Sequence, residues 1–160
     1  MTTSSLFELI AGYMAVAGLH FESESEGGLI VAKIGGEHGN WHTYIQITED
    51  ADDRKVVIHA QLPARIPESN RLKVAELLTR FNYDLVLGNF ELGFDDGEVL
   101  FKTAADVADG QLTQAMFERM YLLNCRVMNA HYGQIWRAAF GEIAPLVGCV
   151  DDRPQGTMIQ

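Results

Sequence analysis

Two histidines and a carboxylate, Glu37, His38 and His42, lie within a stretch of six residues. Imidazole and carboxylate side chains at such short spacing are typical ligands of zinc and other transition metals. Three glycines are interspersed with them, however, which is typical of a loop between strands, and no third firm ligand follows nearby. We therefore interpret this segment as a surface turn and expect no metal site.

A second group of residues that could bind a ligand or transfer protons falls on predicted strands. Strand alternation places Tyr44 and His59 opposite each other on one sheet face, with His42 two residues before Tyr44. A phenol beside an imidazole can exchange protons or bind a small polar ligand. A single imidazole on a strand is more often a half-buried residue without chemistry. His42, Tyr44 and His59 form the candidate ligand face.

The sequence lacks the common signatures of catalysis and cofactor binding. The glycine-rich stretches at 36–39 and 88–93 have no lysine followed by serine or threonine, as a phosphate loop would. No Gly-x-Ser-x-Gly nucleophile elbow occurs. Cys125 falls in the middle of a predicted helix, where packing is the usual role of a thiol. We expect a protein that is not an enzyme and that has no catalytic residues and no cofactor.

The charge of the chain limits its partners. Its 160 residues carry a formal net charge of −10, and no basic stripe is evident along the sequence. Binding of nucleic acid or of an anionic membrane surface is therefore not expected. No apolar run reaches membrane-spanning length, and the start lacks the basic segment of a signal peptide. The expected location is the cytoplasm.

Hydrophobic periodicity predicts an α+β fold with a mostly antiparallel five-stranded sheet and helices chiefly on one face. The predicted order is helix, three strands, helix, two strands, helix, at about 5–18, 29–34, 41–48, 56–62, 71–88, 90–94, 99–103 and 112–144. The acidic segment 20–28 is compatible with a short edge strand. We expect residues 1–144 to form a single domain and residues 145–160 to form a flexible C-terminal tail.

The last two predicted strands form a hairpin. Asp96 and Gly97 suit the two central positions of a two-residue type I′ turn, since both must adopt positive φ. This turn would pair Phe94 with Val99 across the hairpin and place both side chains on the apolar face.

The predicted helix over 112–144 has two adjacent apolar stripes, and one sheet with two shorter helices can cover only one of them. Soluble proteins rarely expose an apolar patch of that size. We expect a dimer or partner interface there, although spacing alone does not decide which stripe faces outward. The residues expected at this interface are Met116, Met120, Tyr121, Leu123, Val127 and Met128.

The run RLKVAELLTRFNYDLVLGNFELGFDDGEVLFKT at 71–103, followed by an apolar helix that begins LTQAMFERMYLLN, resembles the YbjN-domain family of bacterial sensory-transduction regulators. The resemblance covers about residues 5–144. It implies a fold like that of the type III secretion chaperones, which are homodimers that bind extended segments of client proteins.

These observations favour a non-enzymatic chaperone-like or adaptor protein, which holds a segment of a client protein and is itself a homodimer. The alternative is a small-ligand sensor that uses the face of His42, Tyr44 and His59, and the least favoured alternative is an enzyme. An exposed apolar groove would support client binding. A concave pocket with converging polar groups would support a sensor or an enzyme.

Overall fold

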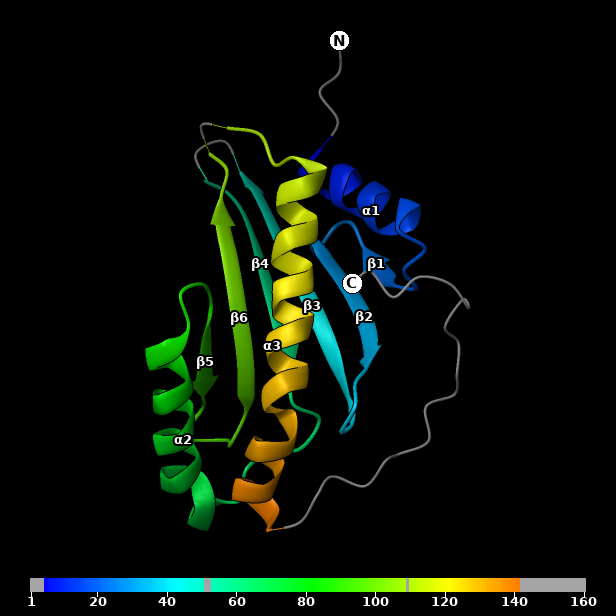
Figure 1. Cartoon of the computed structure of the whole chain (residues 1–160). Helices are drawn as coiled ribbons and strands as arrows, with labels where there is room; N and C mark the ends of the chain where they lie inside the picture. Colours follow the sequence, from blue (N-terminus) through cyan, green and yellow to red (C-terminus); the bar gives the residue numbers. More distant parts are fainter. Residues whose placement is uncertain (1–4, 51–52, 109, 142–160) are drawn as a thin grey trace.

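One antiparallel sheet organises the computed structural model, which describes residues 5–50, 53–108 and 110–141 (Figure 1). Within these residues six strands lie in the order β1-β2-β3-β4-β6-β5. Their bounds are β1 Glu22–Glu24, β2 Leu29–Gly35, β3 Asn40–Asp50, β4 Asp53–Gln61, β5 Asn89–Leu92 and β6 Val99–Asp106.

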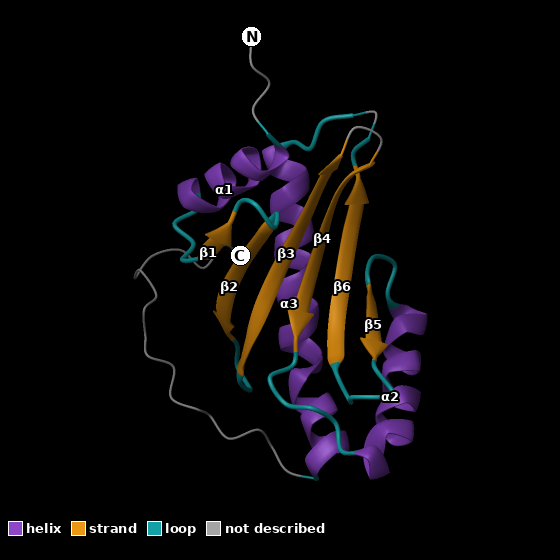
Figure 2. Ribbon diagram, turned by 180° about the vertical axis from the view of Figure 1, so that it is seen from behind, coloured by secondary structure: helices purple, strands orange, loops and turns teal. Residues whose placement is uncertain are grey.

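The described helices cover one face of this sheet. They are α1 Leu6–Val16, the short 3₁₀ helix η1 Glu68–Asn70, α2 Arg71–Asp84 and α3 Gln114–Phe140. In Figure 1, α3 runs along the middle of the sheet, with α1 toward β2 and α2 beside β5. Figure 2, the view from behind, shows the strands without a helical layer in front of them. The predicted α+β class is confirmed.

The predicted count of five strands is one too low. The additional strand is β1, the three-residue segment within the acidic stretch 20–28, and it pairs with β2 at the edge of the sheet. All three of its residues are exposed. A segment this short and this exposed has no hydrophobic alternation, so periodicity does not distinguish it from a loop. Residues 142–160, which include the tail expected from 145, lie outside the described residues.

Side-chain alternation sets the register of the central hairpin. In β3, Trp41, Thr43, Ile45 and Ile47 are buried, and the residues between them are partly or fully exposed. Ile47 pairs with Val56 of β4, which confirms the predicted register. A shift by one residue would turn the buried row of β3 toward the open face, and this penalty fixes the pairing.

The β5–β6 hairpin differs from its prediction. Leu92 pairs with Val99 and Phe90 with Phe101, so the predicted pairing of Phe94 with Val99 is wrong by two residues. The loop is consequently longer than a two-residue turn, and Phe94 is 52% exposed in it.

The reason for the longer loop is a contact with a distant segment. Gly97 adopts φ 75° and donates its N–H to the carbonyl of Gly93 at 2.8 Å. Its own carbonyl accepts the N–H of Ile66 at 2.7 Å, and a Cβ at this position would overlap the Ile66 carbonyl oxygen. Arg71 donates to the carbonyl of Phe94 at 2.6 Å from the start of α2. Local turn preferences do not predict these contacts, because Ile66 and Arg71 lie outside the hairpin.

The core consists of two hydrophobic clusters, and α3 contributes to both. The first includes Phe101 and Met128 and lies under α2 and the C-terminal half of α3. The second includes Ile10 and Phe117 and lies under α1 and the N-terminal half of α3. Among the described residues, no helix has the length and apolar character needed to cross a membrane.

Replacement of Gly97 by valine tests the longer loop. Gly97→Val should lower the free energy of unfolding by at least about 1 kcal/mol, because a β-branched residue resists positive φ and its Cβ meets Ile66. Gly110→Val is the matched control, since a Cβ at Gly110 meets no atom within 4 Å. Urea midpoints of both variants provide the measurement. Equal midpoints for wild type and Gly97→Val would contradict the role given to Gly97.

Candidate functional site

The glycine-rich loop between β2 and β3 packs against α3. The N–H of Glu37 donates to the Asn129 side-chain oxygen at 2.8 Å, and His38 lies against Gly133. Gly39 lies so close to the Tyr132 ring that a Cβ would overlap it. The described residues contain no group of three or more His, Cys, Asp or Glu side chains placed to hold a metal ion. The loop thus docks the β2–β3 hairpin on the helix.

The open face of the sheet brings the candidate ligand face together. Tyr44 pairs with His59 across β3 and β4, as predicted, and the ring centroids of His42 and Tyr44 are 6.2 Å apart. His59 also pairs with Lys102 of β6, whose ammonium group forms an ion pair with Glu91. Burial lowers the pKa of His59, and the positive charge of Lys102 lowers this pKa further.

Two surface hollows of the structure do not include these three residues. One is lined by His38, Gly133 and Arg137, and the other, of about 560 Å³, lies between α1 and the loop before α3 near Tyr13 and Arg54. The open face therefore offers His42, Tyr44 and His59 as neighbours on a sheet surface, outside both hollows.

The predicted interface residues of α3 divide into two groups. Tyr121, Val127 and Met128 are buried in the core, and burial raises the pKa of Tyr121. Met116 is 45% exposed, and Met120 and Leu123 are half-buried on the flank of the helix that faces away from α1. The surface of the chain therefore presents three of the six residues.

Cys125 lies beside the buried Tyr121. Burial raises the pKa of this thiol to about 12, so it is protonated at neutral pH and is a poor nucleophile. Its packing role agrees with the expectation from the sequence.

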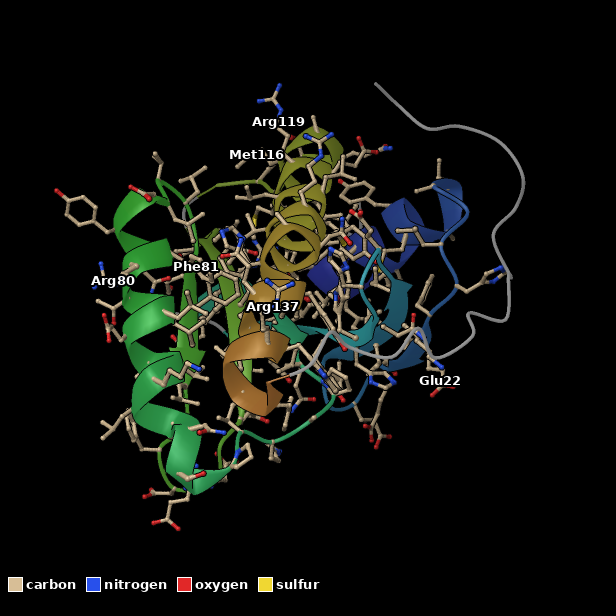
Figure 3. The ribbon with its side chains drawn as sticks, turned by 60° about the horizontal axis from the view of Figure 1, so that its bottom comes forward. Glu22, Arg80, Phe81, Met116, Arg119 and Arg137 are labelled. Carbon is tan, nitrogen blue, oxygen red and sulfur yellow. The ribbon has the colours of Figure 1, made fainter. Side chains whose placement is uncertain are left out.

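Large exposed apolar side chains gather on α2 and on the loop that follows it, a feature that the sequence analysis missed. They are Leu72, Tyr83, Val86 and Leu87, with exposed fractions of 77, 92, 93 and 66%. Phe81, by contrast, lies between α2 and α3, where its ring is 4.2 Å from that of His131 (Figure 3). Leu72 and Tyr83 fall outside the helical stripe that includes Phe81. An apolar residue outside the buried stripe of a helix is expected to be exposed, so the spacing could have predicted both.

Three arginines form a ridge on the outer side of α3, which the charge count along the sequence also missed. They are Arg119, Arg126 and Arg137, and Figure 3 shows the first and last of them on the side away from the sheet. No described carboxylate forms an ion pair with any of the three. They are separated by seven and eleven residues in sequence, so only the helix aligns them.

The lowered pKa of His59 predicts a pH dependence of stability. Because the folded state disfavours protonation, stability is complete above the unfolded pKa of about 6.5 and declines as the pH falls toward the lowered folded pKa. The wild type should lose more stability between about pH 7.5 and about pH 5 than His59→Gln does. Urea midpoints of both proteins at the two pH values measure this difference. Identical losses would show that His59 titrates as it does in the unfolded chain.

Comparison with known proteins identifies a family and structures of similar fold. Residues 7–121 match the model of the YbjN family, described as "Putative bacterial sensory transduction regulator". A crystal structure of YbjN from E. coli, described as "a putative transcription regulator", is similar to the chain with a TM-score of 0.52 and 13% sequence identity. The similarity covers 80% of this chain and 94% of that one. No curated protein matches. Since the family model matches well over half of its residues, the chain belongs to the YbjN family.

Proposed function

We propose that this protein is a non-catalytic regulatory adaptor that binds a segment of another protein and forms a homodimer. The observation that carries the proposal is the group of exposed apolar side chains on α2 and its following loop. Exposed apolar groups gain free energy when a partner removes them from water, at about 25 cal/mol per Å². Their concentration on one side of the molecule is typical of an interaction surface.

The family supports the regulatory part of the proposal. The descriptions of the YbjN family and of the similar E. coli structure both name regulators. Dimer formation and client binding are added by analogy with the type III secretion chaperones. They enter as an analogy because a shared fold alone does not determine function.

The exposed residues lie on two surfaces, and we give one to the dimer contact and the other to the client segment. Leu72 and Tyr83 lie on the side of α2 opposite Phe81, and Val86 follows in the exposed loop; we assign these residues to the contact between two copies. In a two-fold contact each copy presents the same patch, so a moderate patch on one chain is doubled. The flank of α3 around Met116 is then free for the client segment.

A small-ligand sensor is the second candidate function. It is supported by the juxtaposition of Tyr44 and His59 on the open face, where His59 is kept neutral by burial and by Lys102. A neutral imidazole can both donate and accept a hydrogen bond, as recognition of a small polar ligand requires.

Sedimentation equilibrium tests the dimer. The wild type should sediment with twice the chain mass at micromolar concentration, and a Tyr83→Ser, Val86→Ser variant should shift toward the monomer, because it loses the apolar contact. Val16→Ser is the control, since Val16 is 80% exposed on α1, away from this surface. A monomeric wild type would rule out the dimer, and a dimer that withstands the double substitution would place the contact elsewhere.

A further inference from the structure

The outer edge of β6 is only half covered. β5 pairs with β6 over four residue pairs, from Leu92 with Val99 to Asn89 with Lys102. β6 continues to Asp106, and beyond Lys102 no described strand lies on that side of it. Figures 1 and 2 both show the upper part of β6 extending past β5 as the last described strand. We call residues 103–106 the β6 edge.

The alternation of backbone hydrogen bonds along β6 shows which backbone groups of the β6 edge are free to bind another strand. Val107 donates its N–H to Arg54 at 2.8 Å, and Val99 accepts the N–H of Leu62 at 3.0 Å. Odd-numbered residues of β6 therefore bond toward β4, and even-numbered residues point the opposite way. Ala104 and Asp106 accordingly direct their N–H and C=O groups outward, and both residues are exposed. An extended chain laid along this edge would find donors and acceptors in the spacing of a strand.

Apolar side chains border the β6 edge on the helical side. Met116 and Met120 lie on the α3 flank that is not covered by α1, and Ala105 below them is half-buried. Leu87, which is 66% exposed, lies in the loop before β5 and next to Gly88, whose Cβ position falls close to Lys102 and Thr103. Methionine adapts its shape to different partners, so this border can accept several apolar side chains.

A positive charge stands beside this apolar border. Arg119 lies between Met116 and Met120 in sequence and on the outer side of α3 (Figure 3), without a described carboxylate as partner. An acidic side chain of a bound segment would complement it.

We propose that an extended segment of a partner protein binds as an additional strand on the β6 edge. Its apolar side chains contact Met116, Met120 and Leu87, and an acidic residue at its end pairs with Arg119. The inference rests on the proposed adaptor function and names the surface and the chemistry of its client. A second copy fits this edge less well. Only four residues of each β6 edge are open. If two such edges paired antiparallel, the loop after Asp106 of one copy would therefore meet β5 of the other.

Nuclear magnetic resonance titration of the whole isotope-labelled protein tests this site. The probe is a pool of short synthetic peptides in which apolar residues alternate with threonine between terminal aspartates. The pool should shift the amide resonances of Ala104 and Asp106 and the methyl resonances of Met116 and Met120. A pool N-methylated at every threonine and apolar position should not bind, because it lacks the donors for the edge in either strand direction.

Substitutions separate the backbone and charge contributions. Ala104→Pro should abolish binding without unfolding the protein, because its outward N–H takes no part in the bonds to β4. Ala104→Val, which keeps the N–H, is its control and should bind. Arg119→Glu should weaken binding about threefold to fivefold. Arg137→Glu carries the same charge change at the far end of α3 and should leave the affinity unchanged.

Three results would overturn the proposal. The first is no shift with any pool, and the second is equal binding of the N-methylated pool. The third is conversion of a dimer to a monomer by Ala104→Pro, which would show that a second copy covers the edge. If the peptides fail while sedimentation shows a dimer that depends on Tyr83 and Val86, this site is wrong but the adaptor proposal stands. Shifts confined to Tyr44 and His59 would instead favour the sensor.

Discussion

The packing of one long helix along the sheet is the constraint on which the rest of the structure depends. α3 supplies buried side chains to both hydrophobic clusters, so neither cluster is complete without it. At its middle the fully buried Asn124 donates to the carbonyls of Ile58 and Phe101, at 3.1 Å each, in the neighbouring strands β4 and β6. Each such bond contributes about 0.5–1.5 kcal/mol, and the pair fixes the position of the helix along both strands.

The candidate surfaces follow from what this helical layer leaves uncovered. α1 packs beside the N-terminal half of α3 on one flank, and α2 packs beside its C-terminal half on the other. The N-terminal half of α3 therefore keeps one flank open, where Met116 is 45% exposed. The opposite face of the sheet, with Tyr44 and His59, has no described helix over it (Figure 2). Within the described residues, the single helical layer thus leaves the open sheet face and one flank of α3 uncovered.

Charge is also divided between the two layers. The chain has a net charge of −10, yet α3 carries three arginines and a single carboxylate, Glu118. Acids such as Glu22 of β1 and Asp106 of β6 lie on strands. The outer side of α3 would therefore attract an acidic side chain, whereas Glu22 and Asp106 would repel it.

The sequence by itself determined the α+β class, the central register of Ile47 with Val56, and the juxtaposition of Tyr44 with His59. Alternation and helical periodicity are local patterns, and the cost of burying polar residues enforces them. Only the tertiary structure decided the β5–β6 register, because Ile66 approaches Gly97 from outside the hairpin. It also decided which apolar residues of α3 and α2 reach the surface, and it aligned the outer arginines. These features depend on contacts between distant segments, which short-range spacing does not encode.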